Sequence, residues 1–126
     1  MNKKLDKILT EISAGELIDK ITILEIKKTK ISEVNKLKDV EKELLSLSDT
    51  FKKFIPEPSK IQVLIDNLRS IKLKLWDIEN KKRIAEKNNN FNEKFVELAR
   101  SVYKNNDERA KIKLEINNIL GSNIKE

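Results

Sequence analysis

Residues 97–117 read ELARSVYKNNDERAKIKLEIN, and their spacing predicts one long helix. The apolar residues of one helix face are Leu98, Val102, Ile112 and Ile116. Asn105 and Arg109 stand where that apolar face should continue. Buried amide and guanidinium groups lose their water, so they need partners inside the protein. We therefore expect a polar site where this helix packs against its neighbours.

The same apolar rhythm predicts three more helices upstream. The helix at about residues 14–34 is apolar on several sides, which is typical of a helix that is central or shared between subunits. Two seams of heptad type, which indicate coiled-coil-like packing, follow at about 36–54 and 59–88. The segment FIPEPSK at 54–60 separates them, because proline cannot continue a helix. The last helix is expected at about 91–120.

Polar residues and glycine mark the predicted ends of these helices. The expected caps are Ser13 with Glu16, Asn35, Asn90 with Glu93, and Gly121. Whether the last helix is continuous through residues 105–107 stays open, because the side chains of this Asn-Asn-Asp run compete for backbone hydrogen bonds.

These helices predict an all-α fold. Long helices joined by short loops pack antiparallel, so we expect an up-down bundle of three to four long helices. The chain length suits a single helical domain over residues 1–126. The bundle can include a short N-terminal helix, because four apolar residues there keep helical spacing: Leu5, Ile8, Leu9 and Ile12.

The composition excludes several kinds of chemistry. The chain has no Cys and no His, so disulfides, thiolate metal sites, cysteine catalysis and histidine-based acid–base catalysis are ruled out. The net charge of +6 is spread along the chain, and only four of its 27 cations are Arg. Nucleic-acid binders usually concentrate their cations on one face, so nucleic acid is not the expected partner.

No apolar run is long enough to cross a bilayer, and the first residues, MNKKLDKILTEIS, lack the apolar core of a secretory signal. We therefore expect no membrane association and predict a cytoplasmic location.

The last helix carries a second apolar face beside the first. Its members are Val96, Ala99, Tyr103, Ala110 and Leu114. Two sides of one bundle could use both faces, or a second copy of the chain could cover one of them. The small residues would let another helix approach closely. A homodimer is therefore one of the two interpretations that we carry forward.

Charged side chains border that second face. Arg100, Tyr103 and Asp107 share one side of the helix, and Asn106 and Arg109 lie close to them. One interpretation is a surface ion-pair set around a packed tyrosine, which stabilises little. The other is a polar pocket that binds an anion or a partner carboxylate through arginine.

Trp76 is the only tryptophan, and it flanks the seam of the helix at 59–88. Glu79 follows one turn later, and Arg83 is spaced to pair with it. Trp76 is interpreted either as the edge of the core or as a platform for a ligand.

Glu16 and Asp19 lie near the start of the first long helix, where carboxylates complement the helix dipole. The alternative is a Mg²⁺ site completed by carboxylates of other helices, with Glu79, Glu86 and Asp107 as candidates. The E-x-x-D spacing of Glu16 and Asp19 resembles one motif of the all-α nucleotide pyrophosphohydrolases. Their second motif, E-x-x-E, has no convincing counterpart in this chain, which puts that activity in doubt.

Two longer segments resemble a known family. SAGELIDKITILEIKKTKI at 13–31 and ELARSVYKNNDERAKIKLEIN at 97–117, together with LWDIEN at 75–80, are similar to a family of small uncharacterised all-helical proteins from bacteria and marine phages. That family is a domain of unknown function, so the resemblance implies a helical fold and assigns no activity or site residue.

The residues thus predict a helical binding or assembly module that works as a homo-oligomer, a dimer in the simplest case. A Mg²⁺-dependent pyrophosphohydrolase and a weak nucleic-acid binder are the alternatives. We expect no cofactor and no bound metal, and a protein partner is compatible with the pattern. The candidate binding residues are Glu16, Asp19, Trp76, Glu79, Arg100, Tyr103, Asn106, Asp107 and Arg109.

Overall fold

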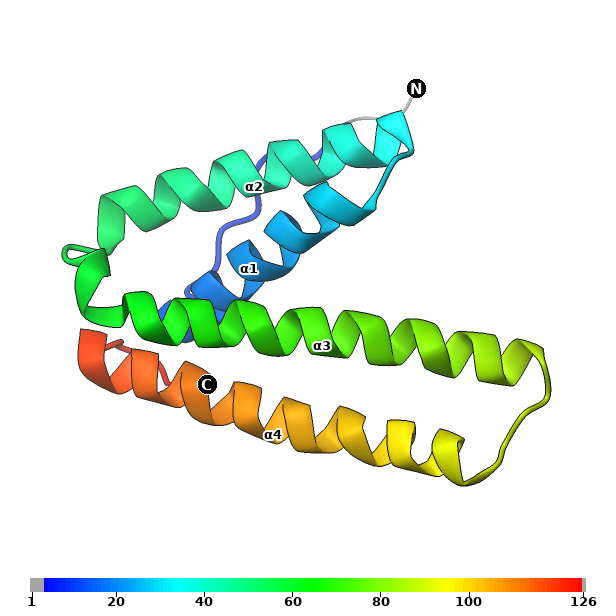
Figure 1. Ribbon diagram of the computed structural model, residues 1–126. Helices are drawn as coiled ribbons and strands as arrows, with labels where there is room; N and C mark the ends of the chain where they lie inside the picture. Colours follow the sequence, from blue (N-terminus) through cyan, green and yellow to red (C-terminus); the bar gives the residue numbers. More distant parts are fainter. Residues whose placement is uncertain (1–3, 126) are drawn as a thin grey trace.

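The protein folds into four α-helices and one short 3-10 helix, as described by a computed structural model over residues 4–125 (Figure 1). The elements are α1 (Ala14–Lys30), α2 (Val34–Phe54), η1 (Pro58–Ile61), α3 (Gln62–Lys87) and α4 (Glu93–Leu120). The described residues contain no strand. The predicted all-α helical bundle is therefore confirmed.

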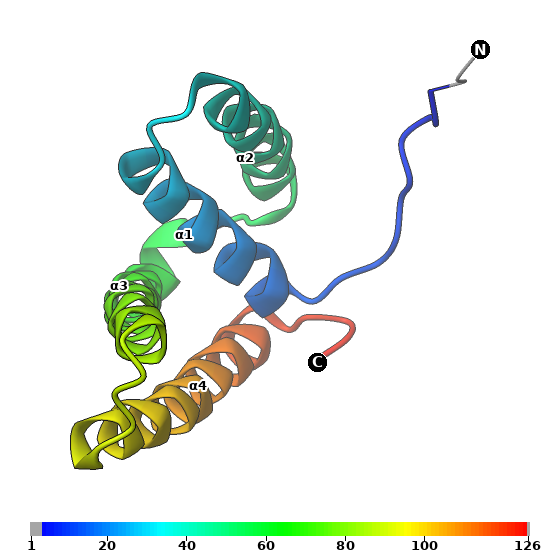
Figure 2. The ribbon, with the colours of Figure 1, turned by 90° about the vertical axis from the view of Figure 1, so that its right-hand side faces the viewer.

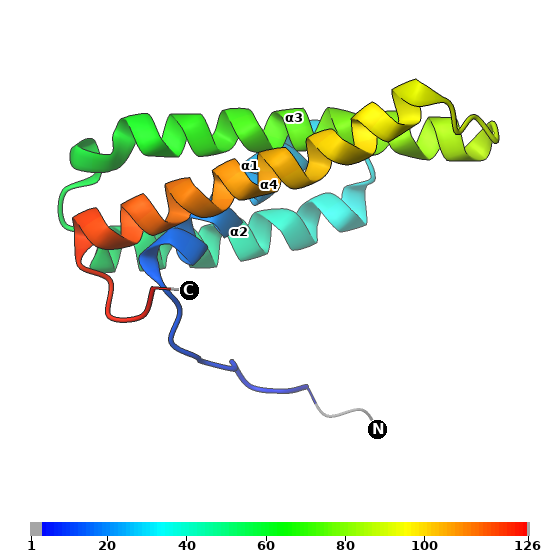
Figure 3. The ribbon, with the colours of Figure 1, turned by 90° about the horizontal axis from the view of Figure 1, so that it is seen from below.

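The helices form two hairpins, α1 with α2 and α3 with α4. Figure 2 shows α1 between α2 on one side and the α3–α4 pair on the other, and α1 packs against all three of these helices. This central place explains why its apolar residues point in several directions, and Leu17, Ile18, Leu24 and Ile26 are all buried. The turn that joins α3 to α4 projects beyond α1 and α2 (Figures 1 and 3).

The main core lies at the opposite end, where the proline-containing link joins α2 to α3. Its buried members are Ile18, Ile55, Ile61, Ile65, Leu68, Ile112 and Ile116. They come from α1, α3, α4 and the link itself, so this cluster ties the two hairpins together. Pro56 and Pro58 end α2 as predicted and begin η1, because neither can continue the preceding helix.

Two of the predicted caps are confirmed. The Ser13 hydroxyl accepts a hydrogen bond from the N–H of Glu16 at 3.1 Å and thereby starts α1. Gly121 ends α4 in the left-handed conformation, with φ of 65°. Glycine adopts this conformation without steric cost, which explains its place at the helix end.

Two other predicted caps are wrong. Glu33, not Asn35, starts α2, because its carboxylate accepts the N–H groups of both Asn35 and Lys36. Asn92, not Asn90, starts α4, because its side-chain oxygen accepts from the first free N–H groups of that helix. The N–H of Asn90 is already bonded to the carbonyl of Ala85 within the preceding turn.

The predicted short N-terminal helix is also wrong for residues 4–13, which are not helical and whose first part leads away from the bundle (Figure 3). Leu5, Ile8 and Leu9 are more than four-fifths exposed. An isolated helix of fewer than about 12 residues is marginal in water, and these side chains find no apolar surface in the same chain. The first three residues of the expected lead-in lie outside the described part.

The last helix is continuous through residues 105–107. The side-chain amide of Asn105 donates to the carbonyl of Ser101 at 2.8 Å, one turn earlier in the same helix. The polar run therefore bonds along α4 without interrupting it. In the described residues, no helix is both long and apolar enough to cross a membrane.

Candidate functional site

An ion cluster with Asp19 at its centre joins α1 to α3 and α4. The Asp19 side chain is only 3% exposed. Arg109 of α4 binds both carboxylate oxygens: its Nε donates to Oδ1 at 2.9 Å, and its Nη2 donates to Oδ2. Lys72 of α3 lies 3.4 Å from Oδ1, and Lys113 of α4 lies 4.0 Å from Oδ2. One buried carboxylate thus faces three cations from two other helices.

Glu16 supplies a second carboxylate one turn before Asp19. Its Oε2 lies 2.5 Å from Nζ of Lys113. Glu16 and Asp19 are the two carboxylates of the cluster, and Lys72, Arg109 and Lys113 are its three cations. The cluster therefore carries one positive charge in excess when all five groups are ionised.

The pKa values in the cluster reflect this imbalance. Burial raises the pKa of Asp19, but the Arg109 hydrogen bond and the surrounding cations outweigh it, so the pKa ends below its ordinary value. Burial lowers the pKa of Lys72, and the positive charges of Arg109 and Lys113 lower it further against the pull of Asp19. The hydrogen bond to Asp19 raises the pKa of Arg109 despite burial. Lys72 is therefore the cation of the cluster whose charged form burial disfavours.

Gly15 lets α1 approach α4 closely enough for the cluster to form. A Cβ atom at Gly15 would lie 2.5 Å from the carbonyl oxygen of Lys113 and 2.9 Å from Oδ1 of Asn117. The N–H of Gly15 donates to that same Asn117 oxygen at 2.6 Å. The first turn of α1 is therefore fixed against α4, which places Asp19 opposite Arg109.

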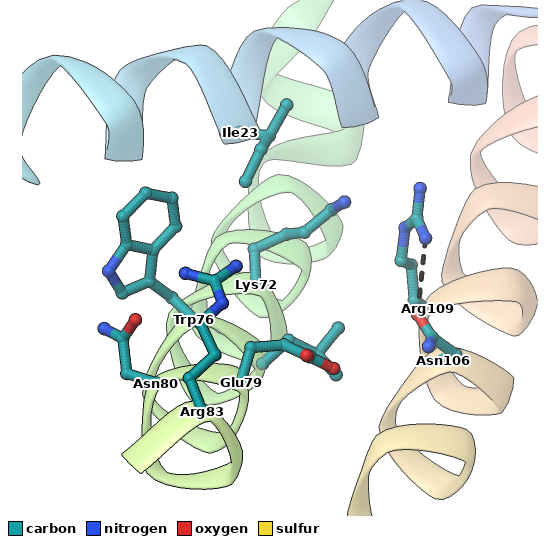
Figure 4. A pocket seen from close by; sticks show the side chains of 9 residues that line it. Ile23, Lys72, Trp76, Glu79, Asn80, Arg83, Asn106 and Arg109 are labelled. Atoms are coloured by element: carbon teal, nitrogen blue, oxygen red, sulfur yellow. Dashed lines mark hydrogen bonds between the residues drawn. The ribbon is translucent and has the colours of Figure 1, made fainter. Parts of the chain in front are cut away.

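A pocket of about 250 Å³ opens beside the cluster, beneath α1 and between α3 and α4 (Figure 4). Its cationic lining residues are Lys72, Arg83 and Arg109. Its apolar lining residues are Ile23, Leu75 and Trp76, and Glu79, Asn80 and Asn106 complete it. Lys72 and Arg109 belong to both features, so the edge of the ion cluster forms part of the pocket wall.

Arg83 brings a third cation to the pocket. The expected pair between Glu79 and Arg83 is not formed, because Glu79 pairs with Lys82 at 3.8 Å. Arg83 forms no ion pair with any residue that the structure describes, and its guanidinium extends toward Lys72 in Figure 4. Asn106 accepts a hydrogen bond from Nη1 of Arg109 at 3.3 Å, which orients the arginine at the pocket edge.

Six of the nine predicted site residues belong to the ion cluster or to the adjacent pocket, and three lie on the outer side of α4. Glu16 and Asp19 belong to the cluster, and Trp76, Glu79, Asn106 and Arg109 line the pocket. Arg100, Tyr103 and Asp107 lie exposed on the outer side of α4, away from both features. Tyr103, for example, is 56% exposed. These three residues therefore lie on α4, as two of the pocket residues do, but they do not line the pocket.

Sequence reasoning missed Lys72 and Lys113 as members of the cluster. Lys72 carried a usable signal, because it follows Ile65 and Leu68 at the three- and four-residue spacing of the buried face of α3. A lysine in such a position needs a buried partner, just as Arg109 does. Lys113 lies one turn from Arg109 on α4. Its place in the cluster can be recognised only when the position of α1 beside α4 is known.

The candidate ligands of the alternative Mg²⁺ site do not gather, and the described residues contain no group of three or more carboxylates able to hold a metal ion. Glu16 and Asp19 contact cations instead, and Glu79 lines the pocket without joining them. The E-x-x-D spacing is used here to pair two carboxylates with lysine and arginine.

Comparison with protein families now identifies the chain. The model of a family of unknown function, DUF6165, matches residues 8–126. The chain belongs to the DUF6165 family. This match confirms that the chain resembles a family without known activity. The match includes both carboxylates of the cluster, its three cations and every pocket residue of this DUF6165 chain. Neither the curated proteins nor the solved structures give a significant match.

Proposed function

We propose that the protein is a binding module whose pocket takes a small organic anion, a phosphate or carboxylate group attached to an apolar or planar part. The observation that carries the proposal is the convergence of Lys72, Arg83 and Arg109 on one pocket beside the buried Asp19. Arginine presents its donors in a planar fork that suits both phosphate and carboxylate oxygens.

The charge balance supports this ligand class. Asp19 already satisfies part of Arg109 and Lys72, but the cluster keeps one excess positive charge and Arg83 adds another. An anion in the pocket would offset both of them at close range. Because burial and like charges lower the pKa of Lys72, a bound anion would also favour its protonated form.

The opposite wall supports an apolar part in the ligand. Trp76, Ile23 and Leu75 offer aromatic and aliphatic surface within the same pocket. Its volume of about 250 Å³ lies just below the range of about 300–1,000 Å³ typical of sites for drug-sized molecules. The proposed ligand is therefore smaller than a drug-sized molecule.

The proposal includes a homo-oligomeric state, a dimer in the simplest case, and a cytoplasmic location. The oligomer is supported by the exposure of apolar side chains along α4, among which Val96 and Leu114 are each 47% exposed and Tyr103 is 56% exposed. Solvent-exposed apolar side chains in a continuous row are typical of a surface that another protein covers.

Isothermal titration calorimetry tests the anion site directly. Inorganic phosphate, phenyl phosphate, acetate and phenylacetate are titrated into the wild-type protein at constant ionic strength. We expect saturable binding, with the phenyl-bearing member of each pair binding more tightly. Absence of saturable heat for all four compounds would contradict the proposal.

A matched pair of variants locates the binding. Arg83→Gln removes an exposed cation that lines the pocket, and Lys42→Gln removes an exposed cation on α2. A hydrogen bond to a charged group contributes about 1.5–3 kcal/mol, so Arg83→Gln should weaken binding at least roughly tenfold. Lys42→Gln should leave the affinity unchanged. Equal affinity in both variants would place the anion elsewhere.

A further inference from the structure

The outer side of α4 presents a row of apolar side chains, with Asp107 at its middle, that no described part of the chain covers. We call this surface the outer α4 face. Its five apolar members are all exposed: Val96, Ala99, Tyr103, Ala110 and Leu114. Core residues Ile112 and Ile116 point from the other side of the same helix, because a helix turns by about 100° per residue. The outer α4 face is therefore separate from the packing that builds the monomer.

The order of residues on this face is close to symmetric about Asn105. Val96 and Leu114 stand nine residues before and after Asn105, and Tyr103 and Asp107 stand two residues before and after it. Ala99 and Ala110 lie at nearly equal intermediate distances. If two copies of α4 lie antiparallel with a two-fold axis at the level of residue 105, Val96 of one copy is level with Leu114 of the other, and Tyr103 is level with Asp107.

The pairs that result are chemically matched. Val96 of one copy lies opposite Leu114 of the other, and the alanines lie opposite each other, which permits close approach of the two helices. The Tyr103 hydroxyl of one copy can donate to the Asp107 carboxylate of the other. A buried or half-buried tyrosine hydroxyl needs such a partner.

Charges on the border of the face favour the same arrangement. In the antiparallel pair, Glu97 lies within one turn of Lys111 of the second copy, and Arg100 lies within one turn of Asp107 of the second copy. A parallel pair would instead set the two Asp107 carboxylates level with each other at the interface, where they repel. The opposite-charge pairs favour the antiparallel direction, in which Arg100 also lies within one turn of Lys111 of the second copy as a like-charge pair.

A hollow on the surface fits the partner helix. A depression of about 350 Å³ is lined by two apolar residues of α4, Ala110 and Leu114, and by the polar residues Lys113, Asn117 and Lys125. Val96 of the second copy lies opposite Leu114 in the antiparallel pair. Its side chain would enter this depression and cover apolar surface that the monomer leaves in water.

We propose that a second copy of the chain occupies the outer α4 face, antiparallel and related by a two-fold axis at the level of residue 105. This interface rests on the proposed homo-oligomer and not on the anion site. The pocket takes Arg109 from another side of α4 and Asn106 from the border of the outer α4 face.

Cysteine cross-linking tests the geometry, because the chain has no cysteine of its own. Three variants are oxidised under mild conditions: Val96→Cys, Leu114→Cys and the double variant with both changes. In the antiparallel pair, the two copies of residue 96 lie about 27 Å apart, from a rise of about 1.5 Å per residue, and cannot form a disulfide. The double variant should form a covalent dimer in high yield, and each single variant should stay uncross-linked.

The mass in solution is measured in parallel by light scattering, together with two charge variants. Tyr103→Glu should convert the dimer to a monomer with an unchanged helical circular dichroism spectrum. Val63→Glu, the matched control at an exposed apolar position on α3, should remain a dimer. A wild-type monomer at high concentration would overturn both the homo-oligomer and this interface. A wild-type dimer in which Val96→Cys cross-links to itself would overturn only the antiparallel interface.

Discussion

Asp19→Asn should be among the most destabilising single substitutions in the chain. It keeps the size and one acceptor oxygen of the side chain but removes the negative charge that faces Lys72, Arg109 and Lys113. Those three cations then face one another without the Asp19 counter-charge, around a side chain that is only 3% exposed in the wild type. Removing one partner of a buried ion pair costs about 3–5 kcal/mol.

The lower end of that range applies here. The Arg109 side chain is 28% exposed and regains some water, and the asparagine oxygen still accepts one hydrogen bond. We expect a loss of about 3 kcal/mol in the free energy of unfolding, against about 5–15 kcal/mol for a typical domain. Urea denaturation followed by circular dichroism measures it, because urea does not screen charges as guanidinium does.

Two companion variants separate charge from general damage. Asp66→Asn removes an exposed carboxylate that pairs with Arg69 and should cost less than about 1 kcal/mol. The double variant Asp19→Asn with Lys72→Met removes one of the stranded cations and should recover part of the loss. A loss of less than about 1 kcal/mol in the free energy of unfolding for Asp19→Asn alone would refute the reasoning, since removing one partner of a buried ion pair destabilises by more than that.

The pH dependence gives a second readout of the same carboxylate. The folded pKa of Asp19 lies below its ordinary value of 3.8, so the unfolded chain takes up the proton first as the pH falls. The stability that Asp19 contributes is complete above that ordinary value and is lost as the pH falls through the lowered folded pKa. The difference in stability between wild type and Asp19→Asn should therefore shrink in acid. A difference that is constant down to the lowest pH would contradict this linkage.

Three further substitutions test the surroundings of the cluster by urea denaturation. Gly15→Ala should destabilise by at least about 1 kcal/mol, although alanine favours helices, because its Cβ would meet the Lys113 carbonyl at 2.5 Å; unchanged stability would contradict that contact. Ser13→Ala should cost about 1 kcal/mol through the lost N-cap of α1, and unchanged stability would contradict this role of the hydroxyl. Lys72→Met should change stability by less than about 1.5 kcal/mol, because it removes the excess cation and leaves Asp19 bound to Arg109; a larger loss would show that Lys72 is needed to balance Asp19.

Much of the fold could be predicted because helical periodicity is a local signal. The seams of α2 and α3 and the prolines between them set the helices to within a few residues, and the broad apolar surface of α1 indicated its central place. The caps were harder to assign. Asn88, Asn89, Asn90 and Asn92 are chemically equivalent candidates, and only the geometry of the turn selects Asn92.

The site was predictable only in part, because its members are far apart in sequence. The interruption of an apolar face marked Arg109, and the carboxylate of Asp19 was noted on its own helix. Their pairing spans 90 residues and depends on how closely Gly15 lets α1 approach α4. The outer α4 face was visible as a second apolar set, whereas the pocket required the side chains of three helices to be placed together.

The anion site is tested most directly by the indole N–H signal of Trp76 in a proton–nitrogen NMR spectrum, since Trp76 is the only tryptophan and lines the pocket. Titration with phenyl phosphate should move this signal saturably in the wild-type protein and in Lys42→Gln. In Arg83→Gln the same titration should need at least roughly tenfold more ligand, as the loss of one charge-assisted hydrogen bond requires. An indole signal that stays in place in the wild type, or that moves identically in Arg83→Gln, would contradict an anion site in this pocket.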